Sequence, residues 1–415
     1  MSLQFITGNS GNGKTKYLFN RIVKEAKANP RDNYLVIVPE QFTMQTQRQL
    51  VDLSENKAIM NIDVLSFKRL AYRVFDELGI TNLTVLEETG KNLVLRKLAA
   101  QEADKLGVIG RNLNRIGYIS EVKSLLSELV QYNISPEELG RYIASGRLSD
   151  TLSDKLKDVL VLYEAFEKFM QDKYITAEEI LNVLSNVAEE SAILRNSVIA
   201  FDEFTGFTPI QNQLIKKLFV ISKKIYVTLT IDCREDDIFK SRGMQELFDM
   251  PKRTVKSLTE MAAFYGIEVE EPIILDKNYR LAENEELSFM EQQLFRKRRC
   301  SFKKAPKHIH IDCLRDPKQE LTKIARRINE LVRNENLRYR DIAIVTGDVN
   351  IYAGYVREIF DKYNIPYFID ATQEILFHPF IEFIRSIPDI AAQNFSADAV
   401  FRFCGAALVS YWTEK

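Results

Sequence analysis

The sequence predicts an α/β protein built around a parallel sheet, with a helical region inserted into it and a second α/β pattern after it. Three observations lead to this fold class. A glycine-rich phosphate-loop motif lies between a strand and a helix within residues 3–27. Apolar runs without alternation, at 33–39 and 196–201, are typical of strands buried on both faces. The region between them, from about 85 to 191, has helical periodicity instead.

The composition is that of an ordinary globular chain. Of 415 residues, 46% are hydrophobic and 28% are charged, and the formal net charge is −1. We therefore expect two or three domains and no global electrostatic attraction to nucleic acid. No apolar run approaches the ~20 residues of a membrane span, and the N-terminus enters a core strand at once, so we expect a cytoplasmic protein without a signal peptide. The cysteines show no paired spacing and are predicted to be reduced thiols.

The phosphate-loop motif covers residues 8–15 and fits G-x-x-x-x-G-K-[ST]. Its glycines let backbone N–H groups turn toward phosphate oxygens, and the next helix adds the positive end of its dipole. Lys14 is predicted to reach the β- and γ-phosphates, and the Thr15 hydroxyl to ligate Mg²⁺. A chance glycine-rich turn is the alternative, but the strand at 3–7 and the helix at 16–27 supply the context that the motif requires. The predicted nucleotide-binding loop is Gly8, Asn9, Ser10, Gly11, Asn12, Gly13, Lys14 and Thr15.

Acidic and aromatic residues further along extend this prediction. Asp202 and Glu203 follow the strand at 196–201. In P-loop proteins an Asp in that place holds Mg²⁺, and a neighbouring Glu orients the attacking water. Two adjacent acids mean little alone, but with a phosphate loop upstream they predict a nucleotide site. Tyr279 and Arg280 are predicted to stack on the base and contact a phosphate, although the start of a surface helix explains the same residues equally well.

The loops after three consecutive strands carry Lys14, then Gln41 and Thr43, then Phe67 and Arg69. Ligands of doubly wound sheets bind at these carboxyl ends of the strands. Aromatic rings stack on bases while Gln, Thr and Arg form hydrogen bonds, so the combination suits single-stranded nucleic acid. Ordinary loop and helix-cap residues are the alternative, and the pattern alone favours that alternative.

The helical region and the second α/β pattern predict the domain plan. Capping boxes at 135–138 and 176–179 mark helix starts in the helical region, which carries no catalytic constellation. Strands at 309–313, 341–346 and 365–369, with helices between them, predict a second parallel sheet. This sheet is not closed by the end of the sequence, so we expect an N-terminal piece of a longer protein. The predicted parts are a first domain at 1–84 and 195–285, a helical insertion at 85–194, and the incomplete start of a second α/β domain at 286–415.

The order of these motifs resembles the AddB (RexB) family, subunits of bacterial AddAB helicase–nucleases. The resemblance covers essentially the whole chain and implies a superfamily 1 (UvrD-like) helicase fold. That fold has a first RecA-like P-loop domain with a helical insertion and, here, the start of a second RecA-like domain. Besides the phosphate loop and residues 66–70, the motifs are VPEQFT at 38–43, FDEFTGFTPIQ at 201–211, NYR at 278–280, IPYFID at 365–370 and HPFIEFIRS at 378–386.

The resemblance implies residue roles, motif by motif. Glu203 would be the water-orienting base, and Gln211 matches the glutamine that senses the γ-phosphate. Asp202 would lie on the Mg²⁺ side, and Tyr279 and Arg280 match the adenine-stacking and phosphate-contacting pair. The residues that fall on the motifs lining the family's single-strand channel, where it reads Chi sequences, are Gln41, Thr43, Phe67, Arg69, Tyr72 and Phe207.

The resemblance also implies a larger assembly. In the family, AddB pairs with an AddA helicase–nuclease subunit, which translocates, and the complex resects DNA ends in double-strand-break repair and recombination. The implied cofactors are ATP and Mg²⁺. An iron–sulfur cluster belongs to the family's C-terminal nuclease, which we expect outside these residues, so the cysteines here are not assigned to it.

Departures from the UvrD-like pattern argue against a motor. Such motors carry an adenine-reading glutamine upstream of the phosphate loop, which this sequence lacks, and a Gly-Asp-x-x-Gln motif where residues 230–234 read Thr-Ile-Asp-Cys-Arg. We expect a helicase-like module that binds ATP and single-stranded DNA without motor activity of its own. An active ATP-driven superfamily 1 helicase or translocase is the alternative. A small-molecule P-loop enzyme such as a nucleotide kinase is a third possibility, but it has no need of the second α/β pattern.

Overall fold

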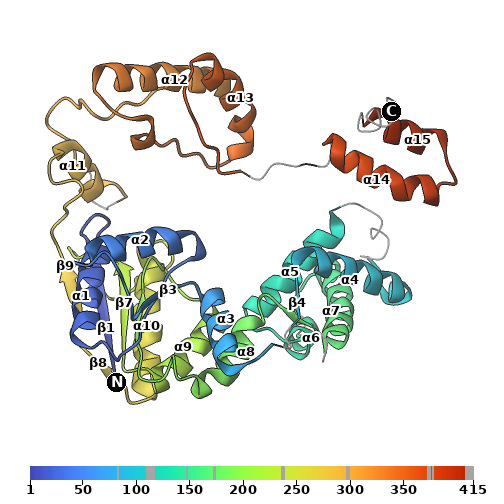
Figure 1. Ribbon diagram of the computed structural model, residues 1–415, viewed down its shortest axis with the longest axis horizontal. Coiled ribbons are helices and arrows are strands. Elements are labelled where there is room, and N and C mark those ends of the chain that lie inside the picture. Colours follow the sequence, from blue (N-terminus) through green and yellow to red (C-terminus); the bar gives the residue numbers. More distant parts are fainter. Residues whose placement is uncertain are drawn as a thin grey trace. The chain divides into compact units, whose positions relative to one another are not determined.

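The structure is a computed structural model (Figure 1). The described chain forms two compact units, Met1–His308 and Ile309–Lys415. The predicted second domain extends to residue 415, and its last nine residues, 407–415, lie outside the described part. The described residues are 1–81, 84–108, 117–145, 148–171, 174–234, 239–295, 300–371, 375 and 378–406.

A parallel sheet organises the first unit. Its described strands form a seven-stranded sheet in the order β3-β2-β6-β7-β1-β8, with β9 also pairing with β1. Strands β1 and β7 are in register from Ser2 opposite Lys224 to Gly8 opposite Thr230. The predicted α/β class with a parallel sheet is therefore confirmed. The strands are β1 (Ser2–Gly8), β2 (Tyr34–Ile37), β3 (Ile62–Leu65), β6 (Val198–Phe201), β7 (Lys224–Thr230), β8 (Glu268–Val269) and β9 (Ile273–Leu275).

Helices cover both faces of this sheet, which explains why its strands do not alternate between apolar and polar residues. Successive strand residues point to opposite faces: Leu35 belongs to one core cluster, while Tyr34 and Val36 belong to another. Helices α1 (Lys14–Ala28) and α2 (Thr43–Leu53) pack on the face of Tyr34. The other face is covered by α3 (Phe67–Leu78), α8 (Ile180–Val187), α9 (Pro209–Ile221) and α10 (Asp249–Phe264).

The helical region lies in the chain between β3 and β6 and has its own hydrophobic core. The predicted capping box at Ser135 is confirmed, since both reciprocal hydrogen bonds with Glu138 form. Thr176 and Glu179 also bond reciprocally, although α8 begins only at Ile180. A short parallel pair, β4 (Val85–Leu86) with β5 (Ile175–Thr176), was not expected from the sequence. The helices are α4 (Glu88–Gln101), α5 (Tyr118–Gln131), α6 (Pro136–Ala144) and α7 (Asp150–Met170).

The second unit corrects one prediction. Helices α12 (Pro317–Asn334) and α13 (Val349–Lys362) form as expected and pack around Leu321 and Phe360. The predicted strands at 309–313, 341–346 and 365–369 are wrong, because in the described part of this unit they pair in no sheet. Apolar patterning favours an extended chain, but a strand also needs a neighbour for its N–H and C=O groups. Here most residues of these segments are exposed, Val345 by 93%, although Ile365 is buried in the core of this unit.

Two further helices, α14 (Pro379–Ala392) and α15 (Ala397–Gly405), complete the described part of the second unit and pack against each other. Phe383 of α14 stacks on Phe403 of α15 with ring centroids 4.8 Å apart. Among the described residues of both units, no helix has the length and hydropathy that crossing a bilayer requires.

Candidate nucleotide-binding site

The phosphate loop connects the end of β1 at Gly8 to the start of α1 at Lys14. Gly11 and Gly13 have φ angles of 88° and 79°, in the left-handed region that favours glycine. A Cβ on Gly11 would lie 2.8 Å from the Cβ of Arg280, so no larger residue fits there without a shift. Gly13 is the N-cap of α1 and no side chain caps this helix. The first N–H groups of α1 are therefore available to an anion.

Lys14 points back over the loop. Its Nζ donates to the carbonyl oxygens of Gly8 at 3.1 Å and Asn9 at 3.0 Å. Burial lowers the pKa of Lys14, and the nearby carboxylates of Asp202 and Glu203 oppose this by raising it. This ammonium is partly buried, and its two acceptors are neutral carbonyls. A negatively charged ligand would therefore bind it more strongly than a neutral one.

Asp202 directly follows β6 and is 1% exposed. Its Oδ1 accepts hydrogen bonds from Thr15 Oγ1 at 3.3 Å and from Thr228 Oγ1. Its Oδ2 is buried without a hydrogen-bond partner among the described residues. Burial is the main cause that raises the pKa of Asp202, and the charge of Glu203 adds to it. A buried carboxylate oxygen without a partner, next to a threonine hydroxyl, fits a hard cation such as Mg²⁺.

Glu203 has a φ of 64°, which is uncommon for a residue other than glycine and concentrates at functional sites. Its Oε1 accepts a hydrogen bond from Thr15 Oγ1 at 3.4 Å, so the predicted catalytic base lies beside the predicted Mg²⁺ ligand. No three His, Cys, Asp or Glu side chains come together as metal ligands in the described chain. Mg²⁺ commonly uses only one or two carboxylates together with substrate phosphates, and the Thr15–Asp202 pair suits that mode.

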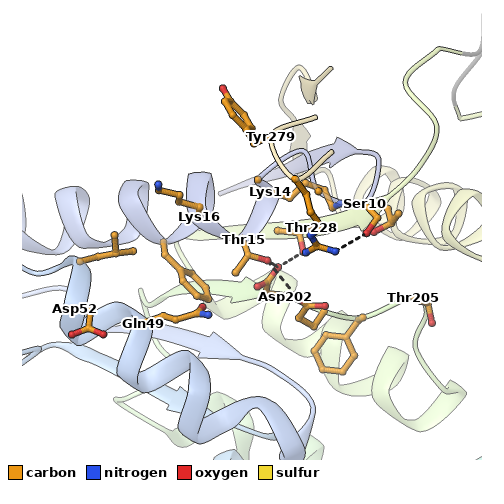
Figure 2. Close-up of a pocket in the computed structure, with 18 residues that line it drawn as sticks. Ser10, Lys14, Thr15, Lys16, Gln49, Asp52, Asp202, Thr205, Thr228 and Tyr279 are labelled. Atoms are coloured by element: carbon orange, nitrogen blue, oxygen red, sulfur yellow. Dashed lines mark hydrogen bonds between the residues drawn. The ribbon is translucent and has the colours of Figure 1, made fainter. Parts of the chain in front are cut away.

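These groups line one cavity of about 740 Å³, within the range of ligand pockets. Figure 2 shows Lys14, Thr15 and Asp202 close together in it, with Lys16, Gln49 and Asp52 to one side. The cavity also contains Glu203, Tyr279 and Arg280, so the structure brings most of the predicted nucleotide set together. Sequence reasoning missed the contributions of α1 and α2, because helical periodicity marks only which face is apolar. The missed lining residues on these two helices are Lys16, Phe19, Gln49, Asp52 and Leu53, and those elsewhere are Phe204, Thr205, Thr228 and Thr230.

The segment that ends in Tyr279 and Arg280 is bonded to the phosphate loop. Tyr279 N donates to Gly11 O at 3.0 Å, and Asn278 Nδ2 donates to Ser10 O at 3.0 Å. Arg280 NH1 reaches Ser10 Oγ at 3.5 Å. The Tyr279 side chain remains 65% exposed, which leaves its ring accessible to a planar ligand.

Gln211 is placed differently. It does not line the cavity; its Oε1 accepts a hydrogen bond from Thr208 N at 2.9 Å. The Gln211 N–H in turn donates to Thr208 Oγ1, which completes a capping box at the start of α9. In this arrangement the amide serves the helix cap, and its contact with a γ-phosphate stays a prediction.

The predicted DNA-contacting residues fall into two groups. Thr43 is buried and donates to Glu40 O at 3.0 Å. Phe67 is 7% exposed, and its ring lies among those of Phe201, Phe204 and Phe207, with centroid distances of 5.8, 5.6 and 6.3 Å. Phe67 stacks on Phe201 and meets Phe204 and Phe207 edge to face, and Phe204 and Phe207 are only partly buried. The exposed members of the set are Gln41, Arg69 and Tyr72.

Glu40 joins the loops after β2 and β3. Its carboxylate accepts hydrogen bonds from Ser66 Oγ and from Arg69 Nε, the latter at 2.9 Å. Ser66 is the N-cap of α3, so one carboxylate fixes both the helix start and a predicted DNA contact. The hydrogen bond from Ser66, followed by that from Arg69, lowers the pKa of Glu40.

This geometry predicts a pH-dependent stability. Because the pKa of folded Glu40 is lowered, its stabilisation is present above the unfolded pKa and is lost as pH falls through the lowered value. We expect the melting temperature of the wild type to exceed that of Glu40→Gln at neutral pH, with the gap closing in acid. Asp63→Asn is the control. Asp63, in β3, lies 4.0 Å from Arg73, which is on the same helix as Arg69. A gap independent of pH would contradict the Glu40 prediction.

Comparison with known proteins bears on the same residues. A family model described as "ADDB, N-terminal" matches residues 5–291, which include the phosphate loop, Asp202 and Tyr279. The chain belongs to the AddB family. The resemblance drawn from the motifs is therefore confirmed, and the matched region is the N-terminal part of AddB.

Individual AddB relatives agree. A subunit of the ATP-dependent helicase/deoxyribonuclease of Lachnoclostridium phytofermentans is 38% identical over 420 aligned residues, which cover 100% of this chain and 36% of the relative. The subunits of the same name from Clostridium tetani and Clostridium acetobutylicum are each 33% identical, over 100% and 97% of this chain and 36% and 35% of theirs. The chain thus spans about 36% of the length of such relatives.

Proposed function

We propose that this AddB N-terminal region holds Mg–ATP and contacts single-stranded DNA, without motor activity of its own. One observation carries the nucleotide part of the proposal. The Oδ2 of Asp202 is buried and has no hydrogen-bond partner among the described residues, while Oδ1 of the same carboxylate accepts from Thr15, in a cavity that the phosphate loop also lines. A phosphate loop and an acidic strand end that meet in one cavity support an NTP site better than either motif alone.

In this site different residues bind the phosphates, the Mg²⁺ and the base. The N-terminal N–H groups of α1 and the Lys14 ammonium bind phosphate oxygens. Thr15 and Asp202 hold Mg²⁺, which neutralises phosphate charge when bound. The Arg280 guanidinium, which donates to Ser10 Oγ, is close enough to the loop to bind a phosphate instead. The exposed ring of Tyr279 stacks on the base.

Two features support loss of the motor. Gln211 is bonded into a helix cap instead of facing the cavity. Asp232 and Arg234, in the stretch where motors carry Gly-Asp-x-x-Gln, pair with each other at 2.8 Å. An active motor remains the second candidate, because Glu203 lies next to Thr15 as a hydrolytic base should.

Nucleotide binding and turnover separate the two candidates. We expect the chain to bind a fluorescent ATP analogue with Mg²⁺ and to hydrolyse ATP no faster when single-stranded DNA is added. DNA-stimulated turnover of about 1 per second or faster, abolished by Lys14→Ala, would establish the motor instead. Absence of nucleotide binding would remove both.

The wider role is part of the same proposal. The relatives' name supports a subunit of an ATP-dependent helicase/deoxyribonuclease. We propose that it acts in the cytoplasm with an AddA partner, on DNA ends in double-strand-break repair and recombination, and scans for Chi. The nuclease and its iron–sulfur cluster would lie in the part of such relatives that this chain does not match. The RecA-like nature of the domains, with the predicted bounds, belongs to this proposal as well.

DNA contact by Arg69 gives a direct prediction. Arg69→Gln is expected to weaken binding of a fluorescently labelled oligonucleotide and to reduce the slope of log affinity against log salt by about 1, because one cation no longer releases a counterion. The control is Lys256→Gln, which removes another exposed cation with an acidic partner, this one on α10. Equal loss in both variants would show that only net charge matters and would contradict a specific contact.

A further inference from the structure

The side chain of Asn9 occupies a position that the phosphate-loop motif leaves open, yet it is 3% exposed and fully engaged. Its Nδ2 donates to Asp232 Oδ1 at 3.2 Å and to Glu291 Oε1 at 2.9 Å. Its Oδ1 accepts from Cys233 N at 3.1 Å and from Cys233 Sγ at 3.2 Å. Two segments that are distant in the sequence therefore hydrogen-bond to the loop. They are the residues after β7 and helix α11 (Glu285–Gln293).

Arg234 joins the two carboxylates that accept hydrogen bonds from Asn9. Arg234 Nε donates to Asp232 Oδ1 at 2.8 Å. Its NH1 and NH2 donate to Glu291 Oε2 and Oε1 at 3.0 and 2.9 Å, a bidentate pair. Burial favours a neutral Asp232, but the hydrogen bonds from Arg234 lower the pKa of Asp232 overall, so the carboxylate stays ionised. Bidentate guanidinium–carboxylate pairs have a fixed geometry, so this network holds Asn9 and α11 in a defined relation.

The same residue touches the predicted phosphate-binding cation. Lys14 Nζ donates to Asn9 O, and the backbone of Asn9 also accepts from Asn12 N at 3.2 Å. A phosphate that draws Lys14 toward itself takes a hydrogen bond away from Asn9. Because both ends of the Asn9 amide are hydrogen-bonded, a shift of the loop at Asn9 must move with, or break, its bonds to Cys233 and Glu291.

We propose that Asp232, Arg234 and Glu291 are positioning residues that hold the phosphate loop through Asn9 and transmit nucleotide occupancy to α11. This inference rests on the proposed nucleotide binding. By the reciprocity of linked equilibria, a change at α11 then also alters nucleotide affinity. Helix α11 lies in the sequence just before the second unit, so the network links the nucleotide site to the segment that leads there.

The test uses Glu291→Gln and Arg234→Lys, the second of which keeps the charge but loses the bidentate fork. Affinity for a fluorescent ATP analogue with Mg²⁺ is measured together with amide hydrogen exchange in 285–293, with and without the nucleotide. In the wild type, nucleotide is expected to slow exchange in 285–293. In both variants we expect affinity to fall about fivefold or more and this slowing to disappear, while slowing at the start of α1 persists.

Glu285→Gln is the matched control, because Glu285 lies on the same helix but pairs with Lys304. It should behave as the wild type does. Wild-type nucleotide binding with unchanged affinity and unchanged slowing in Glu291→Gln would overturn this inference alone. A wild type that binds no nucleotide would overturn the proposed function and this inference together.

Discussion

Replacing Lys14 with alanine is expected to lower the affinity for Mg–ATP by about a hundredfold or more. Hydrogen bonds to charged groups contribute roughly 1.5–3 kcal/mol each, and a phosphate-bound ammonium makes more than one. The carbonyl oxygens of Gly8 and Asn9 already hold the Lys14 ammonium over the loop that is predicted to bind phosphate. Titration with a fluorescent ATP analogue measures the effect.

Lys24→Ala is the control for this variant, since Lys24 is an exposed lysine further along the same helix. It removes the same charge from the chain and should leave affinity unchanged. If Lys14→Ala binds the analogue as tightly as the wild type does, the cavity is not a phosphate site, and the interpretation of residues 8–15 fails with it.

Asp202→Asn is expected to have two opposite effects. It removes the carboxylate that suits Mg²⁺, so the difference in nucleotide affinity with and without Mg²⁺ should collapse. It also removes a buried ionisable group, so the nucleotide-free protein should melt at a higher temperature at neutral pH. Gains of stability through loss of a functional charge are a common trade-off, and each kcal/mol raises the melting temperature of a domain by roughly 2–4 °C.

The pH dependence gives the sign of the second effect. Burial raises the pKa of folded Asp202 above its unfolded value. Its contribution to stability is then fully present below the unfolded pKa and is lost as pH rises through the raised pKa. The stability advantage of Asp202→Asn should therefore grow from acid to neutral pH, while the Mg²⁺ effect on the wild type should grow in the same direction. A variant less stable than the wild type at pH 7, or one that keeps its Mg²⁺ dependence, would contradict this.

Local features of this protein were readable from the sequence. The strand–loop–helix unit at residues 2–28 and the capping box at Ser135 depend on residues a few positions apart, so spacing alone determines them. The Asp202–Glu203 pair was placed in the same way, by a buried strand directly before it. The family, too, followed from the order of such local motifs.

Other features of the protein depend on its tertiary structure. The burial of Phe67 among phenylalanines, the capping role of Gln211 and the unpaired segments of the second unit each depend on which distant residues become neighbours. A sequence pattern states that a side chain is aromatic or a segment extended, but solvent exposure and hydrogen-bond partners are properties of the assembled structure. The sequence therefore determined the strand, loop and helix around residues 8–15, in which the phosphate-loop motif lies. Only the tertiary structure decided that Asn9 is held by Glu291, 282 positions along the chain, because that contact exists only once β1, β7 and α11 have come together.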